Sequence, residues 1–303
     1  MSELDDILAQ QTALQSGGRG HFTIDPTRQR ELLIRVGLQN IAQGFLKLCQ
    51  GIYRARPHNL QFQSQTNLLR ITFQPEADLP TPLWDSGPMG LAILSLSQEY
   101  CVEWRWKYRG FARPDGFEEI EETNSADGLA EIVIRQPQVR WWHRDWTPAI
   151  RSLLERKLVW ISFRWSWNER PAKEPPGLSL RAEALVPAKH GEAGDLPLPT
   201  VSRAKIALVR PEIPEAEGSR RGLAILGATE HSWSEAFFVL DGVLLEGERN
   251  LLDRPGVVAV ISAEGLTPAL NGLELVHDAA FRERLQSLRP EVAWLDGINQ
   301  KGR

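Results

Sequence analysis

Apolar and polar residues follow one another along much of the chain with the periods of regular secondary structure. Over residues 41–55 the apolar positions have the spacing of one buried helical face: Ile41, Phe45, Leu48, Cys49 and Ile52. The next two segments, N-L-Q-F-Q and L-L-R-I-T-F, alternate apolar with polar residues. This alternation predicts two strands, and the polar residues at 64–67 predict a hairpin turn between them.

Similar patterns predict the other elements of the first half. Residues 101–108 alternate strictly, which predicts a half-buried strand with its large aromatic residues on the core side, including Trp104 and Trp106. Further strands are predicted at 130–135 and 159–167, helices at 3–14, 28–36, 89–98 and 147–157, and a solvated acidic turn at 117–124. Two of these helices have a proline directly after Asp25 or Thr147, as helix starts often do.

A proline-rich stretch divides the chain into two parts. Strands are predicted again at 223–227, 236–245 and 257–261, and a helix at 278–288. We therefore expect an N-terminal helix and linker at 1–19, a first domain at 20–170, a loop or linker region at 171–220 and a smaller α/β domain at 221–303.

Composition excludes several classes of protein. The 303 residues are 42% hydrophobic and 24% charged, with a net charge of -4, so the overall charge does not indicate binding to nucleic acid or to an anionic membrane. Cys49 and Cys101 lie far apart and outside any metal-ligand spacing, so we predict neither a disulfide nor a metal site. The acidic N-terminal segment lacks the features of a signal peptide, which predicts a cytoplasmic protein without a membrane segment.

Several short motifs are similar to those of one superfamily. They are G-H-F-T-I-D at 20–25, the helix and strand pair at 45–73, D-G-V-L-L-E at 241–246 and P-G-V-V-A-V at 255–260. With the order of predicted elements, they resemble the GHKL (Bergerat-fold) ATP-binding superfamily, and most closely its bacterial heat-shock-ninety-chaperone-like proteins. The resemblance implies an α+β fold class, with a Bergerat-like two-layer α/β sandwich and a second, smaller α/β domain.

The residues that handle metal and water in that superfamily are altered here. Its second helix carries E-x-x-x-N-x-x-D, and the corresponding residues of this chain are Lys47, Gly51 and Arg54. Lysine cannot act as a carboxylate base, and glycine has no side-chain oxygen for Mg²⁺. Lys47 and Arg54 could instead meet phosphates directly as cations. We favour solvated charges on the polar face of the helix, because no second phosphate element accompanies them.

The second superfamily motif, D-x-G-x-G, is also altered. The corresponding segment begins with Asp85 and Gly87, but its second glycine is displaced by one position and Pro88 removes a backbone donor. Asp85 and Gly87 are therefore candidate remnants of a nucleotide site, and an ordinary turn before a helix is the favoured interpretation.

Tryptophan is abundant, with eleven residues. The segment W-W-H-R-D-W at 141–146 is the best candidate for an exposed contact surface, formed by Trp141, Trp142, Arg144 and Trp146. It could stack nucleobases or sugars, but core packing or a protein interface is favoured for the tryptophans as a group. His143 and His231 lack the motif of a hydrolytic triad, so no catalytic residue is assigned.

These observations favour a catalytically degenerate chaperone-like protein that binds other proteins, as a subunit of a bacterial multi-protein system. No cofactor is expected, and ATP is the cofactor that the resemblance would imply. The alternatives are a divergent ATP-dependent chaperone-like ATPase and a tryptophan-rich module that binds nucleic acid or glycans. The sequence does not indicate the oligomeric state.

Overall fold

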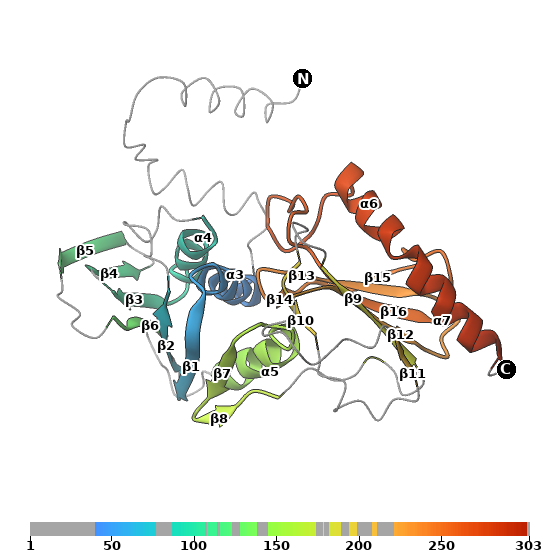
Figure 1. Ribbon diagram of the computed structural model, residues 1–303. Helices are drawn as coiled ribbons and strands as arrows, with labels where there is room; N and C mark the ends of the chain where they lie inside the picture. Colours follow the sequence, from blue (N-terminus) through green and yellow to red (C-terminus); the bar gives the residue numbers. More distant parts are fainter. Residues whose placement is uncertain are drawn as a thin grey trace, which may run out of the picture.

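The computed structural model describes residues 40–76, 87–106, 108–113, 116–122, 128–137, 145–173, 178, 182–188, 194–198, 208–210 and 221–301. These residues form two mixed β-sheets, each with helices packed on one face (Figure 1). The predicted α+β fold class is therefore confirmed. The helices predicted over 3–14 and 28–36 lie outside the described residues.

The first sheet has the strand order β5-β4-β3-β6-β2-β1-β7-β8. All its pairs are antiparallel except that of β1 with β7, which is parallel. Its strands are β1 (Pro57–Gln65), β2 (Leu68–Pro75), β3 (Cys101–Arg105), β4 (Tyr108–Arg113), β5 (Gly116–Glu122), β6 (Ala130–Arg135), β7 (Arg164–Trp167) and β8 (Arg170–Pro171).

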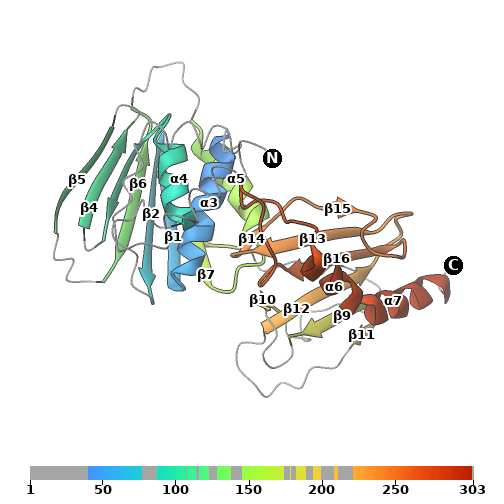
Figure 2. The ribbon, with the colours of Figure 1, turned by 90° about the horizontal axis from the view of Figure 1, so that it is seen from above.

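Three helices cover one face of this sheet and give a two-layer α/β sandwich (Figure 2). They are α3 (Ile41–Arg54), α4 (Gly87–Leu96) and α5 (Thr147–Lys157). The core between the layers takes alternate side chains from strands β1, β2, β3, β6 and β7, as the alternation of the sequence requires. Trp104, Trp165 and Trp167 are buried in this core, which confirms the core position expected for these residues.

Three segments of the first sheet differ from the sequence-based expectation. The strand predicted over 101–108 ends at Arg105, and Tyr108 already begins β4, the antiparallel neighbour of β3. The acidic run predicted as a solvated turn is the edge strand β5, whose backbone pairs with β4. Acidic residues are unfavourable inside a sheet but common on an edge, where one side of the strand faces water. The strand predicted over 159–167 begins only at Arg164, because the chain turns between α5 and β7.

The second sheet has the order β11-β9-β12-β16-β13-β14, with β10 on β12 and β15 on β13. Its strands are β9 (Ala182–Pro187), β10 (Leu196–Pro197), β11 (Leu208–Arg210), β12 (Arg221–Ala228), β13 (Glu235–Leu240), β14 (Val243–Leu244), β15 (Glu248–Arg249) and β16 (Val257–Ser262). The loop or linker region expected at 171–220 thus contributes three strands, β9, β10 and β11, to this sheet. Its prolines and charges flank short strands and hide their pattern.

Two C-terminal helices, α6 (Ala279–Ser287) and α7 (Arg289–Lys301), pack against one face of the second sheet. Asp278 caps α6 by accepting a hydrogen bond from the Phe281 amide at 2.9 Å. Helix α7 is not among the predicted elements, and Pro290 stands in its first turn, where proline is tolerated. No helix among the described residues has the length and apolar character needed to cross a membrane.

Candidate functional site

The candidate site is the junction between α3 and the second sheet. One face of α3 is apolar and lies in the first core, through residues such as Phe45 and Leu48. Lys47, Gly51 and Arg54 follow one another at steps of four and three residues, so they share another face of the helix. We call each sheet with its helices a unit. The neighbours of these three residues are α4 and the turns at 241–242 and 271–272 of the second unit.

Gly51 lies against the first turn of α4. A Cβ atom added to Gly51 would stand 2.7 Å from Cβ and 2.8 Å from the backbone nitrogen of Met89. Backbone atoms of a packed helix cannot move aside cheaply, so this position of α3 accepts only glycine at the present helix spacing. The space that an asparagine side chain would need at Gly51 is filled by Met89.

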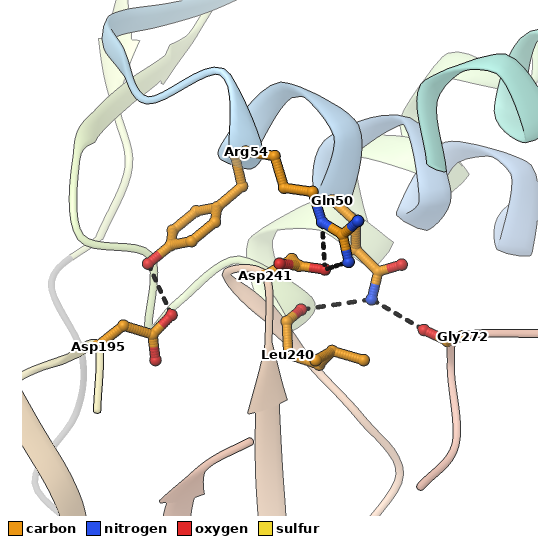
Figure 3. A network of polar contacts seen from close by, with 7 residues as sticks. Gln50, Arg54, Asp195, Leu240, Asp241 and Gly272 are labelled. Carbon is orange, nitrogen blue, oxygen red and sulfur yellow. Dashed lines mark hydrogen bonds and ion pairs between the residues drawn. The ribbon is translucent and has the colours of Figure 1, made fainter. Parts of the chain in front are cut away.

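Arg54 is bound to the second unit. Its Nε and Nη2 atoms donate to the same carboxylate oxygen of Asp241, at 3.0 and 2.8 Å (Figure 3). Asp241 and Gly242 form the tight turn between β13 and β14, and both have positive φ angles, as a two-residue hairpin requires. Gly87 lies beside Arg54, since a Cβ atom added to Gly87 would be 4.0 Å from Nη1 of the guanidinium.

Gln50 and Lys47 contact a second turn of the same unit. Gln50 is fully buried, and its Nε2 donates to the carbonyl oxygens of Leu240 at 3.3 Å and Gly272 at 3.0 Å (Figure 3). Lys47 is only 5% exposed, and a Cβ on Gly272 would stand 1.8 Å from its Nζ. The expectation that Lys47 is a solvated charge is therefore wrong.

Burial changes the chemistry of the Lys47 amine. The pKa of Lys47 is lowered from its ordinary 10.5 to about 8, mainly by desolvation and also by the Arg54 cation, while Asp241 partly opposes both effects. Gln50 presents an Oε1 atom that has no hydrogen-bond partner among the described residues. A buried cation and an unpaired amide oxygen thus lie side by side at Gly272.

Tyr53 supplies the third contact of α3 with the second unit. Its hydroxyl donates to Asp195 Oδ2 at 2.8 Å, and Ser262 Oγ donates to the other oxygen of that carboxylate at 2.7 Å. Burial, followed by the Asp195 charge, raises the pKa of Tyr53. Asp195 therefore connects Ser262, at the end of β16, to Tyr53 of α3, and this network stabilises the junction.

The structure brings four of the sequence-predicted nucleotide positions together: Lys47, Gly51, Arg54 and Gly87. Asp85 lies outside the described residues, as do Trp141, Trp142 and Arg144. Trp146 is partly buried and packs against the rings of Phe45 and Tyr100, with centroids 5.5 and 5.0 Å away.

Sequence reasoning missed the residues of the second unit that complete the junction. Asp241, Gly272 and Asp195 stand 142 to 222 positions from their partners on α3. The D-G pair at 241–242 is a local signal for a hairpin turn, but a local signal cannot reveal that the turn contacts α3. Within the described residues, no group of three or more His, Cys, Asp or Glu side chains is arranged to hold a metal ion.

Comparisons with known proteins leave the family open. No protein-family model matches the chain, and no curated protein matches it. Among solved structures, the chain is similar to the B subunit of the DNA gyrase from Myxococcus xanthus. The match has 10% sequence identity and a TM-score of 0.47, and it covers 84% of this chain and 89% of the gyrase chain. A likeness of this degree assigns neither a family nor an activity to the protein.

Proposed function

We propose that this chain is a catalytically degenerate relative of the GHKL proteins, of the heat-shock-ninety-chaperone-like type, and that it works by binding other proteins. The observation that carries the proposal is the direct packing of Gly51 on Met89. A Mg²⁺-binding amide at Gly51 would overlap the first turn of α4. The motifs that resemble the superfamily thus accompany a helix whose surface is already occupied.

The neighbouring residues support the same conclusion. The Lys47 amine can accept a proton only when it is neutral. A buried amine therefore cannot replace the carboxylate that orients water in the superfamily. Arg54 is engaged by Asp241, and Gln50 by two backbone carbonyls. In this proposal α3 joins two units into one body and has no part in hydrolysis.

An exposed hairpin of the second unit is the part that we assign to partner binding. Pro268 pairs with Leu275, and Ala269 donates to Glu274 at its base. Leu270, at its tip, is 69% exposed, and Val276 is also exposed. Single exposed apolar residues are ordinary, but Leu270 lies two residues from Gly272, whose carbonyl oxygen Gln50 binds, so a bound partner would contact a segment that is fixed to α3.

Isothermal titration with Mg-ATP tests the pseudo-ATPase part. We expect no binding heat beyond dilution and no release of phosphate. Micromolar binding with turnover that Lys47→Ala abolishes, and that the distant surface variant Arg289→Ala leaves intact, would establish the alternative of a divergent ATPase instead.

Affinity capture from an extract of the native cells tests the protein-binding part. We expect proteins that are retained by the wild-type chain and lost with Leu270→Glu. The matched control is Leu129→Glu, because Leu129 is also exposed but lies in the first unit. Equal retention by both variants would show that the hairpin is not the contact surface.

A further inference from the structure

One face of the first sheet points away from α3, α4 and α5 (Figure 2). On this face, four adjacent strands carry five arginines. They are Arg70 of β2, Arg105 of β3, Arg109 and Arg113 of β4, and Arg135 of β6. We call this surface the arginine face. Residues next to them, such as Leu69, Trp104 and Ile134, are buried against the helices, so alternation directs the arginines to the other side.

The strand register brings these arginines together. Arg105 lies opposite Arg109 across the β3–β4 pair, and Leu68 lies opposite Arg135 across the β2–β6 pair. Strands in a sheet are about 4.8 Å apart, so the four strands β4, β3, β6 and β2 span about 14 Å. Arg105, Arg109 and Arg135 all lie within 4.0 Å of the Glu103 carboxylate, so the arginines form a cluster that extends over four strands.

Two carboxylates lie among these arginines and are less exposed to solvent than the guanidinium groups. Glu103 accepts from Arg109 at 3.0 Å and stands 4.0 Å from both Arg105 and Arg135, and Glu131 is 3.3 Å from Arg70. These two carboxylate side chains are only 19–21% exposed, whereas the four paired arginines are 40–54% exposed. The guanidinium groups are therefore more accessible to a ligand in solution than the two carboxylates.

The charge of this face is opposite to that of the chain. Among the described side chains on these four strands, five arginines stand against two glutamates, so the arginine face is positive, while the whole chain has a net charge of -4. Clustering on one face, not composition, produces the positive surface.

Phe111 adds an aromatic group to the same surface. Arg109 lies 4.9 Å and Arg113 5.9 Å from the centre of its ring. Aromatic rings and guanidinium planes are the surfaces on which unpaired bases stack, and arginine binds phosphate with two parallel hydrogen bonds.

We infer that the arginine face binds single-stranded nucleic acid, with Arg70, Arg105 and Arg135 on the phosphates and Phe111 beneath a base. The inference concerns the face opposite the junction and does not rest on the proposed function. An acidic protein is less suited to this surface, because protein interfaces need an apolar centre. The outward positions beside the arginines are mainly polar, among them Gln61, Gln63 and Thr72.

Fluorescence anisotropy with a labelled oligothymidylate of about 16 nucleotides, the upper end of common site sizes, tests the inference on the full chain. We expect micromolar binding that weakens about twentyfold between 50 and 200 mM salt, as about three phosphate contacts on a single strand require. The variants Arg105→Gln and Arg135→Gln should each weaken binding and reduce the salt slope by about 0.7. Phe111→Ala should weaken binding about tenfold with the slope unchanged.

The matched control is Arg289→Gln, since Arg289 is an exposed arginine paired with Asp253 in the second unit. It should bind as the wild type does. Circular dichroism and the thermal midpoint identify variants that are folded, and Arg70→Gln replaces any variant that is not. No binding at low salt, an equal loss in Arg289→Gln, or equally strong competition by polyglutamate would overturn the inference.

Discussion

Lys157, in the last turn of α5, donates to Glu246 of the second unit at 2.6 Å. Together with the pair formed by Arg54 and Asp241, it fixes the two units from two different helices. Two contacts from separate helices restrict rotation of one unit relative to the other more than a single contact would. The contribution of each contact to the free energy of unfolding can be measured separately.

A double-mutant cycle of Arg54→Ala and Asp241→Ala measures the first of these contacts. Because Arg54 is about half exposed, we expect a coupling of about 0.5–1 kcal/mol in the free energy of unfolding, and less at high salt. Urea unfolding at two salt concentrations gives the value. The same cycle on Arg289 and Asp253, which are both more exposed, should give a smaller coupling. A coupling of zero for Arg54 and Asp241 would show that this ion pair does not stabilise the junction.

Gly51→Ala should destabilise the protein. The added Cβ would press on Met89 backbone atoms, and we expect a loss of about 1–2 kcal/mol despite the better helix propensity of alanine. Chemical denaturation measures the loss. Gly297→Ala in α7 is the matched control, because a Cβ there meets nothing within 4 Å, and it should stabilise the protein by about 0.5–1 kcal/mol. If both variants gained stability, the close approach of α3 and α4 would be wrong.

Lys47→Met should stabilise the protein near neutral pH. The pKa of the Lys47 amine is about 8 in the folded protein, against an ordinary 10.5. Below pH 8 both the folded and the unfolded chain hold the proton, so the buried charge destabilises the fold fully. Between the two values only the unfolded chain holds it, so wild-type stability rises with pH. We expect Lys47→Met to be more stable by about 1–3 kcal/mol at pH 7, and the gain to shrink by pH 10.

Urea unfolding at pH 7 and pH 10 measures this effect, with Lys47→Arg as the control. Arginine stays charged throughout, so the difference between the Arg and Met variants should not change with pH. A Lys47→Met variant that is less stable than the wild type at pH 7 would show that the amine is well solvated or paired.

The two cysteines should differ in reactivity. Cys49 is buried in α3, and burial raises the pKa of its thiol to about 12. Cys101 is partly exposed at the start of β3. We expect Ellman's reagent to modify one thiol in the native protein and both in urea, with the native signal lost in Cys101→Ser. Rapid modification of both thiols in the native protein would contradict the packing of α3.

Local pattern was sufficient for much of the fold. The helix at Ile41–Arg54, the hairpin after it and the helix at Thr147–Lys157 each bury one regular face, so spacing alone predicts them. Short strands such as β9 escaped prediction, because only a few residues carry their pattern and prolines surround them. Strand β5 escaped because an edge strand can be acidic.

The sequence predicted some of the residues that α3 contributes to the candidate site, but not their partners in the second unit. Comparison with a helix motif was enough to select Lys47, Gly51 and Arg54, but their partners belong to turns far along the chain. Lys47 illustrates the limit: a lysine on the polar side of an amphipathic helix is normally solvated, but here Lys47 is buried and its Nζ lies close to Gly272, far along the chain. The arginine face was hidden for the opposite reason, since an overall negative charge masks a positive surface.

The separation in sequence between Gln50 and Gly272, 222 positions, bears on how the chain is made. On a ribosome, α3 emerges long before the turns that cover it, so the helix must tolerate water on this side while synthesis continues. Lysine, glutamine and arginine are readily hydrated. These polar residues of α3 therefore reduce the apolar surface that the first unit exposes before Val243 and Leu273 of the second unit pack against its core.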